Sequence, residues 1–185
     1  MLQCAVSPQW LDCCPGYVVH HPRPGRFPGF TYVGYSRYFL TICASRPGAP
    51  FRDGPVAESV LEQLRRALAD EQFALLAYCF MPDHVHLVLE GLSDTADLCR
   101  LVSRWKQITG YWYRRRSGRP LWWSGYHDHV LRDDESTADF VRYVLENPLK
   151  AGLAKRVGEF RFAGSDVFSE EEIREMVMSV PGERA

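Results

Sequence analysis

The stretch FALLAYCFMPDHVHLVLE, residues 73–90, decides the fold. Residues 73–81 form an unbroken apolar run, residues 84–90 begin with alternating polar and apolar side chains, and Pro82-Asp83 between the two stretches is a turn pair. An apolar run and an alternating run joined by a two-residue turn are typical of an antiparallel hairpin. The sequence therefore predicts two paired strands here.

Further elements precede and follow this hairpin. Aromatic and β-branched residues over 38–43 predict a buried strand, and apolar residues at helical spacing predict an amphipathic helix over 56–70. After the hairpin, Ser93 or Asp94 is expected to cap a second helix that runs toward Tyr113. The chain thus places a helix on each side of the hairpin in sequence.

The C-terminal half adds one strand and two helices. A fourth strand is expected over 127–131, and Ser136 is expected to open a third helix. That helix should stop near Asn147, because Pro148 disfavours the helical conformation in the residue before it. Three consecutive glutamates begin a last short helix over 170–177.

The order of the first six elements indicates the fold class. Strand, helix, strand, strand, helix, strand is the split βαβ, ferredoxin-like pattern. We expect an α+β fold, an antiparallel sheet with helices packed on one face, and an open face that is free to carry a site. Three parts are expected: an irregular Pro/Gly-rich arm over 1–34, a compact domain over 35–168, and a C-terminal helix and tail over 169–185.

Composition excludes several classes of protein. The net charge of −1 over 185 residues excludes a uniformly basic nucleic-acid coat, although a local basic patch stays compatible with it. No apolar run approaches the roughly 18–20 residues that cross a bilayer, and the N-terminus does not resemble a secretory signal. The six cysteines do not resemble a disulfide framework, so we expect reduced thiols and a cytoplasmic protein.

Two histidine pairs are candidates for metal binding. In a strand, residues two apart point to the same face, so His84 and His86 would project together at a separation that one metal ion can bridge. His127 and His129 repeat this spacing. Two satisfied or solvent-facing histidines would give the same pattern, and spacing alone does not separate the two interpretations.

Tyr143 and Asn147 form a second candidate site. They are four residues apart near the end of the third predicted helix, so they share one face of it. Asn147 offers a carboxamide oxygen as a third metal ligand, and Tyr143 offers a phenol beside that metal. Taken separately, the tyrosine is equally compatible with a packing role and the asparagine with an ordinary helix stop.

The third candidate is a basic, aromatic segment between residues 100 and 123. It contains no Asp or Glu, and its basic residues are Arg100, Arg104, Lys106, Arg114, Arg115, Arg116 and Arg119. Its aromatic residues are Trp105, Tyr111, Trp112, Tyr113, Trp122 and Trp123. Local positive charge with stacking rings is what single-stranded nucleic acid requires. A core-facing stripe is the interpretation that we favour for Trp105 and Ile108, but it does not explain the three consecutive arginines.

Three stretches resemble one known family. YCFMPDHVHL at 78–87 and YVLENPLKAGL at 143–153 are similar to motifs of the single-tyrosine transposases of the HUH superfamily, in particular the REP-associated tyrosine transposases. YHDHVLR at 126–132 resembles the strand between those motifs, and the likeness extends from about residue 35 to 168. The resemblance implies an HUH endonuclease-like fold and makes 35–168 the catalytic domain.

The resemblance also implies roles for individual residues. It makes His84 and His86 the histidine pair, Asn147 the polar third ligand and Tyr143 the nucleophile, and we add Lys150 to the DNA-binding residues. By ligand softness alone, two imidazoles and an amide oxygen suggest zinc or manganese. The family uses Mg²⁺ or Mn²⁺, and we expect one of these. The base that deprotonates Tyr143 stays open among His127, His129 and water.

The implied activity is nicking and rejoining of single-stranded DNA at a hairpin-flanked site through a 5′-phosphotyrosine intermediate. The sequence has no glycine-rich phosphate loop for ATP or GTP hydrolysis, which agrees with strand joining that needs no nucleotide. The alternatives are a non-catalytic module that binds single-stranded nucleic acid on an RRM-like sheet and a hydrolase that uses the His-x-His site. We expect a monomer or homodimer, cytoplasmic, nucleoid-associated when bound to DNA and with no membrane partner.

Overall fold

The hairpin predicted from residues 73–90 is present. The computed structural model describes residues 30–45, 47–133 and 135–178. Strand β2 (Phe73–Met81) and strand β3 (His84–Gly91) pair antiparallel, with Met81 opposite His84 across a two-residue turn. Most of the predicted N-terminal arm, residues 1–29, and the end of the tail, 179–185, lie outside the described residues.

The hairpin lies within a five-stranded antiparallel sheet. Strand β1 (Arg37–Cys43) pairs with β3 on one side and with β4 (His127–Val130) on the other, and β5 (Ala163–Gly164) pairs with β2. The strand order is β4-β1-β3-β2-β5. The first four strands have the ferredoxin-like order, so the predicted α+β class is confirmed. The two-residue strand β5 was not predicted, because so short a strand has no periodicity.

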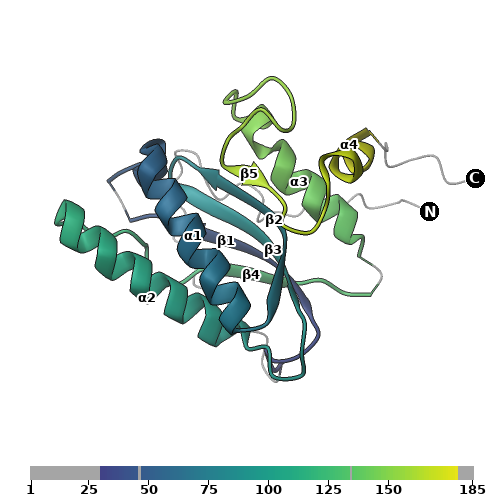
Figure 1. Ribbon diagram of the computed structural model, residues 1–185, viewed down its shortest axis with the longest axis horizontal. Helices are drawn as coiled ribbons and strands as arrows, with labels where there is room; N and C mark the ends of the chain where they lie inside the picture. The colour runs from purple at the N-terminus through teal and green to yellow at the C-terminus, as the bar shows by residue number, and fades with distance from the viewer. Residues whose placement is uncertain (1–29, 46, 134, 179–185) are drawn as a thin grey trace, which may run out of the picture.

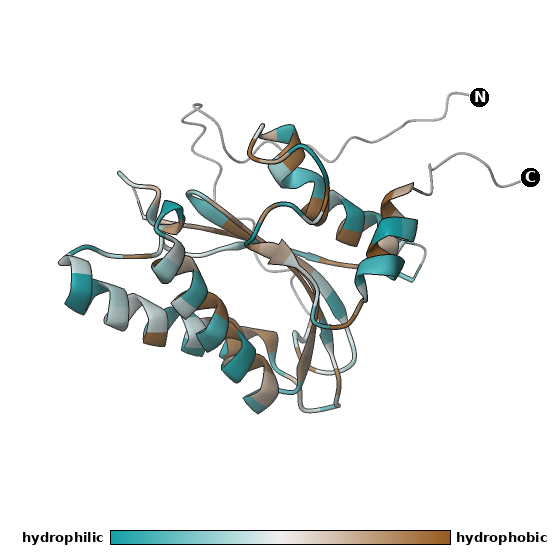
Figure 2. Ribbon diagram, turned by 45° about the horizontal axis from the view of Figure 1, so that its top comes forward, coloured by the Kyte–Doolittle hydropathy of each residue, from teal (hydrophilic) through white to brown (hydrophobic). Residues whose placement is uncertain are grey.

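Two helices cover one face of the sheet, as expected. They are α1 (Gly54–Asp70), preceded by the short 3₁₀ helix η1 (Pro50–Arg52), and α2 (Leu98–Ser117). Together with the sheet they enclose the larger core, which contains Leu64, Phe80 and Trp105. The C-terminal end of α2 projects beyond the sheet (Figure 1), and Figure 2 shows that this end is hydrophilic.

The opposite face is not left open. Helix α3 (Thr137–Lys150) packs on it through Val141, Val144 and Leu145, and α4 (Glu170–Met178) lies beside α3 (Figure 1). The reason is visible in β2, which is apolar and buried almost throughout, so both of its faces need cover. The prediction of helices on one face therefore holds for α1 and α2 and is corrected for α3.

The N-cap of α2 differs from the prediction. Asp97, not Ser93 or Asp94, is the N-cap, and its carboxylate accepts a hydrogen bond from the backbone of Arg100 at 3.0 Å. The helix runs past Tyr113 and ends at Gly118, which has the left-handed conformation with φ of 72°. No helix in the described parts of the chain is long and apolar enough to cross a membrane.

Helix α3 begins as predicted at the Ser136 cap but continues past the predicted stop. It runs through Pro148 to Lys150. A proline in a helix removes one backbone donor, but here it lies in the last turn and is itself buried. The turn closes beyond it, because the backbone of Ala151 donates to the carbonyl of Asn147 at 3.0 Å.

Candidate active site

Two histidines at the start of β3 converge on the sheet face that α3 covers. His84 and His86 project from the same side of the strand, and their Nε2 atoms lie 3.1 Å apart. Both residues are buried, with 8% and 6% of their surface exposed. Solvent-facing histidines are therefore excluded, and a metal-binding pair and a pair satisfied by hydrogen bonds remain.

A partner on the other ring nitrogen orients each imidazole. His84 Nδ1 lies 2.8 Å from Asp83 Oδ1, and His86 Nδ1 lies 2.9 Å from Thr41 Oγ1. An ionised carboxylate only accepts hydrogen bonds, so His84 Nδ1 carries the proton and His84 Nε2 presents a lone pair. The Thr41 hydroxyl can donate or accept, so either tautomer of His86 has a partner.

The charge state of the pair suits a cation. Burial, reinforced by the neighbouring His84, lowers the pKa of His86 to about 3, so this imidazole is neutral at physiological pH. Imidazoles with converging Nε2 atoms and hydrogen-bonded Nδ1 atoms are the arrangement found in metal sites. No group of three or more His, Cys, Asp and Glu side chains in the described residues forms a complete site. The two imidazoles fit a cation that takes its remaining ligands from elsewhere.

Tyr143 lies against this histidine pair. Its ring contacts His86 edge-on, with 5.9 Å between ring centroids, and contacts Phe39 in the same manner at 5.8 Å. The position follows from the packing of α3, because Val144 and Leu145 are buried against the sheet and Tyr143 precedes them in the same turn. The structure therefore brings together a phenol and two imidazoles from separate elements.

Asn147 lies one turn after Tyr143 on α3. Its side-chain Nδ2 donates to the carbonyl of Tyr143 at 2.8 Å. Its Oδ1 makes no hydrogen bond within residues 30–45, 47–133 and 135–178. The hydrogen bond to Tyr143 fixes the orientation of the Asn147 amide. No hydrogen bond joins this amide to His84 or His86 in the described residues.

The second His-x-His pair lies on the same face of the sheet. His127 and His86 are both opposite Thr41 in the strand register, so the three residues form one row across the sheet. His129 lies one row away, where its Nε2 is 2.9 Å from a carboxylate oxygen of Glu135 and its ring stacks on Phe140. His129 is thus engaged with a carboxylate, whereas His127 shares the row of the histidine pair.

Lys150 lies beside Tyr143 at the end of α3. Its Nζ is 4.8 Å from the centroid of the Tyr143 ring and 3.3 Å from Glu146 Oε2. An ammonium this close to the centroid makes a cation–π contact with the ring. Of the basic residues singled out in the sequence, this one is next to the candidate site.

Three residues of the basic segment have partners within the chain. Arg100 pairs with buried Glu71 at 2.5 Å, and Arg104 pairs with Asp70 at 2.9 Å. Lys106 Nζ donates to the backbone carbonyls of Trp123 and Gly125 at 3.0 and 2.5 Å. Sequence alone could not show these contacts, because the acidic partners lie at the end of α1 and the carbonyls lie beyond the end of α2. These three residues therefore have structural contacts within the chain, and their assignment to DNA binding stays a prediction.

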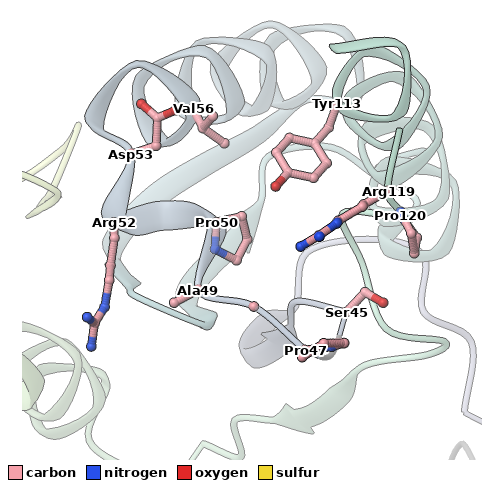
Figure 3. Close-up of a pocket in the computed structure, with 11 residues that line it drawn as sticks. Ser45, Pro47, Ala49, Pro50, Arg52, Asp53, Val56, Tyr113, Arg119 and Pro120 are labelled. Atoms are coloured by element: carbon pink, nitrogen blue, oxygen red, sulfur yellow. The ribbon is translucent and has the colours of Figure 1, made fainter. Parts of the chain in front are cut away.

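The remaining arginines are exposed. Arg114, Arg115 and Arg116 lie in the last turn of α2, and their side chains make no hydrogen bond or ion pair within the described part of the chain. Arg119 follows the helix and lines a cavity of about 800 Å³ between the end of α2 and the start of α1. Figure 3 shows Arg119 and Tyr113 pointing into this cavity.

Sequence reasoning missed the residues that orient the imidazoles. Thr41 lies in the middle of a buried strand, 45 residues before its partner, and carried no signal. In the sequence Asp83 indicates only a turn. Its position next to His84 is the signal that could have identified it as a hydrogen-bond partner of that imidazole. Phe39 lies at the site because β1 pairs with β3, and the residues around Phe39 in the sequence do not reveal this pairing.

Comparison with known proteins agrees with this geometry. The family model of IS200-like transposases matches residues 37–147, which include the histidine pair, Tyr143 and Asn147. An uncharacterised protein of Haemophilus influenzae is 22% identical over 162 residues, covering 71% of this chain and 90% of its own length. The REP-associated tyrosine transposase of Escherichia coli is 26% identical over 139 residues, covering 71% of this chain and 78% of the relative.

The fold has a solved counterpart. A REP-associated tyrosine transposase bound to a REP hairpin superposes with a TM-score of 0.62 at 18% identity, over 72% of this chain and 79% of that one. At this identity the likeness concerns the fold, and it confirms the fold expected from the motifs. The match of the family model covers more than half of the chain. The chain therefore belongs to the IS200-like transposase family, and it is an enzyme that acts on DNA.

Proposed function

We propose that this enzyme nicks and rejoins single-stranded DNA, with Tyr143 as the nucleophile. The observation that carries the proposal is the placement of the Tyr143 ring 5.9 Å from the ring of His86, on the sheet face where the two histidine Nε2 atoms converge. An RRM-like module would need an open sheet face, and α3 packs on this one. The arrangement thus favours catalysis over simple binding.

The proposed step is an in-line displacement at phosphorus. The phenolic oxygen of Tyr143 attacks the scissile phosphate, forming a P–O bond to the tyrosine, and the bond from phosphorus to the 3′ oxygen breaks. The departing oxygen takes a proton and becomes a 3′-hydroxyl, while the phenol proton passes to a base. The bond to Tyr143 conserves the phosphodiester, so a second 3′-hydroxyl can reverse the step and join strands without ATP.

His127, His129 and water are the candidate bases for that proton. His127 shares the row of His86 and Thr41 across the sheet, and the Nε2 atom of His129 is held by Glu135. A phenol with a pKa near 10 is a poor nucleophile at neutral pH. The ammonium of Lys150 lies 4.8 Å from the centroid of the Tyr143 ring.

We also propose a divalent cation at the histidine pair, with magnesium or manganese as the ion. The residues that would hold it are His84 and His86 through Nε2 and Asn147 through Oδ1. When bound, such a cation neutralises charge that develops on the scissile phosphate. Thr41 and Asp83 support this role, because they hold the two imidazoles with their Nε2 atoms directed at one point.

The proposed substrate is single-stranded DNA next to a hairpin. The support comes from the Escherichia coli relative, named for REP elements, and from the solved structural counterpart, which is bound to a REP hairpin. The exposed arginines at the end of α2 give this chain a basic surface for the phosphates. With DNA as the substrate, we place the protein in the cytoplasm at the nucleoid, as a monomer or homodimer.

The proposal is tested by trapping the covalent adduct. Wild-type protein is incubated with end-labelled, hairpin-bearing single-stranded oligonucleotides and Mn²⁺, and a denaturing gel separates protein-linked DNA. We expect an adduct that is absent from Tyr143→Phe, which keeps the ring contacts with His86 and Phe39 and binds the DNA within a few-fold of wild type.

Two further variants separate the alternatives. His84→Ala should abolish the adduct without unfolding the domain, and His127→Gln should slow adduct formation if His127 is the base. Cleavage at a normal rate by Tyr143→Phe would instead support the hydrolase that uses the His-x-His site. DNA binding without cleavage by the wild type, under every cation tested, would support the binding module.

A further inference from the structure

A hollow on the outer side of α2 is lined by exposed aromatic residues. Tyr111 and Trp123 are 68% and 57% exposed, and both line a depression of about 520 Å³. Gln107, Gly110 and Arg114 lie around them, and the depression is formed by α2 and the segment that leads to β4. A large aromatic side chain that stays in water gives up the free energy of burial, so two in one hollow call for an explanation.

The exposure of Trp123 is fixed by its neighbours. The preceding residue, Trp122, packs against Trp105 at 4.9 Å between ring centroids, and its indole nitrogen donates to Thr109 Oγ1 at 2.8 Å. The backbone nitrogen of Trp123 donates to the carbonyl of Cys43 at 3.0 Å. With Trp122 turned into the core, the next side chain along the segment is directed outward.

Lys106 holds the same segment from the helix side. Its ammonium donates to the carbonyls of Trp123 and Gly125, and its burial lowers its pKa to about 8. A partly buried lysine with no carboxylate partner in the described residues is costly. The contacts with the two carbonyls offset this cost and tie the backbone at Trp123 and Gly125 to α2.

The charge around the hollow is positive. The sequence from 98 to 127 contains no Asp or Glu, and the acids that neutralise Arg100 and Arg104 lie at the other end of α2. Arg114 lines the hollow, and Arg115 and Arg116 are exposed next to it. Exposed rings surrounded by unneutralised arginines are complementary to bases and phosphates of a single strand.

The hollow also lies at the end of the sheet where the histidine pair begins. Trp123 is hydrogen-bonded to Cys43, and Cys43 is opposite His84 in the register of β1 and β3. Two main-chain links therefore connect the aromatic segment to the first histidine. A single strand of DNA that leaves the histidine pair at this edge can continue along the segment around Trp123 toward α2.

We propose that Tyr111 and Trp123 form a stacking subsite for an unpaired base of the bound single-stranded DNA, and that Arg114 contacts the phosphate of that nucleotide. The inference rests on the proposed function, because it assumes that the substrate is single-stranded DNA. It adds a binding contact that lies outside the candidate active site. Lys106 is a positioning residue in this subsite and acts through Trp123.

Binding is measured in a Tyr143→Phe background, so that the DNA stays intact. Fluorescence anisotropy gives the Kd for a hairpin oligonucleotide with single-stranded tails. Loss of one stacked base is expected to weaken binding about 10-fold in Trp123→Ala and in Tyr111→Ala. Trp123→Phe should restore most of the affinity, because a ring is kept. Tyr35→Ala is the matched control, because Tyr35 is 74% exposed and precedes the opposite end of β1.

An abasic scan of the oligonucleotide locates the stacked base. At one position, removal of the base should raise the Kd of the protein that keeps Trp123. The same abasic oligonucleotide should bind Trp123→Ala with nearly the same Kd as the intact oligonucleotide does. That coupling would not arise from a general loss of folding. Tyr111→Ala lies on an exposed helix surface, so it keeps the test decisive if Trp123→Ala does not fold.

Several outcomes would overturn the subsite. These are unchanged affinity in both alanine variants, equal losses in Tyr35→Ala, and an abasic scan without coupling to Trp123. Loss of self-association in Trp123→Ala, measured by sedimentation without DNA, together with unchanged DNA affinity, would make the hollow a protein interface. Adduct formation by the wild type with unchanged DNA affinity in the variants would refute the subsite alone, whereas coupling without any adduct would refute the proposed cleavage alone.

Discussion

At the scale of single residues, the candidate site depends on side chains that do not touch the substrate. Thr41 is 4% exposed, and its hydroxyl is the partner of His86 Nδ1 at 2.9 Å. Without this partner, a buried ring nitrogen would lack a hydrogen bond and the imidazole would lose its orientation. Thr41 is therefore as important to the geometry as a ligand would be.

Thr41→Val removes the hydroxyl and preserves the shape of the side chain. We expect the free energy of unfolding to fall by about 1–3 kcal/mol, because a buried polar atom loses its partner. The affinity for Mn²⁺ should fall by roughly 10- to 100-fold, because the orientation of His86 is lost. Urea unfolding and calorimetric titration measure the two effects. Mn²⁺ affinity equal to that of the wild type would show that Thr41 does not orient a ligand.

Cys79 gives a second prediction at this scale. Burial raises the pKa of its thiol to about 12, so the reactive thiolate is scarce at pH 8. The native protein should resist alkylation of Cys79, and this resistance should disappear in denaturant. Since the unfolded thiol ionises near pH 8.5, this group also lowers stability as pH rises above about 9. Peptide mass spectrometry after iodoacetamide treatment checks the first effect, and rapid labelling of native Cys79 would contradict it.

At the scale of elements, the two ends of helix α2 differ in the partners of their basic residues. Its first half is fixed to α1 by Arg100 and Arg104, whose partners are Glu71 and Asp70, and its last turn carries three exposed arginines. Basic residues in a last turn also stabilise the helix dipole. The three arginines can therefore have a structural role or a DNA-binding role, and measurements of stability and of DNA affinity distinguish the two.

Replacing Arg114, Arg115 and Arg116 with Ala is expected to change the salt dependence of DNA binding. Each phosphate contact with a single strand contributes about −0.7 to the slope of log K against log salt, so three contacts amount to roughly two units. Binding isotherms at four salt concentrations give the slope for the wild type and the variant. An unchanged slope would remove this turn from the DNA path and leave the candidate active site untouched.

The N-terminus of α2 gives a structural prediction. Asp97→Ala should lower the free energy of unfolding by about 1 kcal/mol, because the backbone of Arg100 loses the cap. Asp94→Ala is the matched control, since Asp94 is exposed and makes no hydrogen bond in the described residues. Denaturant midpoints compare the two variants. Equal losses in both would point to a general charge effect rather than a cap.

At the scale of the whole molecule, cation binding should be visible as stability. A ligand that binds only the folded state stabilises it by about 2.7 kcal/mol at 100 times its Kd. For a protein of this size that corresponds to a rise in Tm of roughly 5–10 °C. Thermal scans with Mn²⁺ and with EDTA should show this shift for the wild type and lose it for His84→Ala. A shift of the same size in His84→Ala would place the cation elsewhere.

Much of this architecture could be predicted from local patterns. The Pro82-Asp83 turn and the flanking apolar runs indicated the hairpin, and the spacing of His84 and His86 put both rings on one face. The contacts that could not be predicted join distant segments. Asp97 became the cap of α2 because Ala96 and Leu98 are buried beside it, and α3 crossed Pro148 because its apolar stripe completes the second core.

The separation of the site residues along the chain has a consequence for folding kinetics. The histidines are neighbours in one hairpin, which closes a short loop, whereas Tyr143 reaches them only after a segment of more than 50 residues has folded between them. Contacts between distant segments form late, because the entropy of closing long loops opposes them. We therefore expect Tyr143, the proposed nucleophile, to join the histidine pair late in folding. If Tyr143 has that role, a nascent or partly folded chain that holds the pair without the phenol would be unable to cut the DNA that it meets.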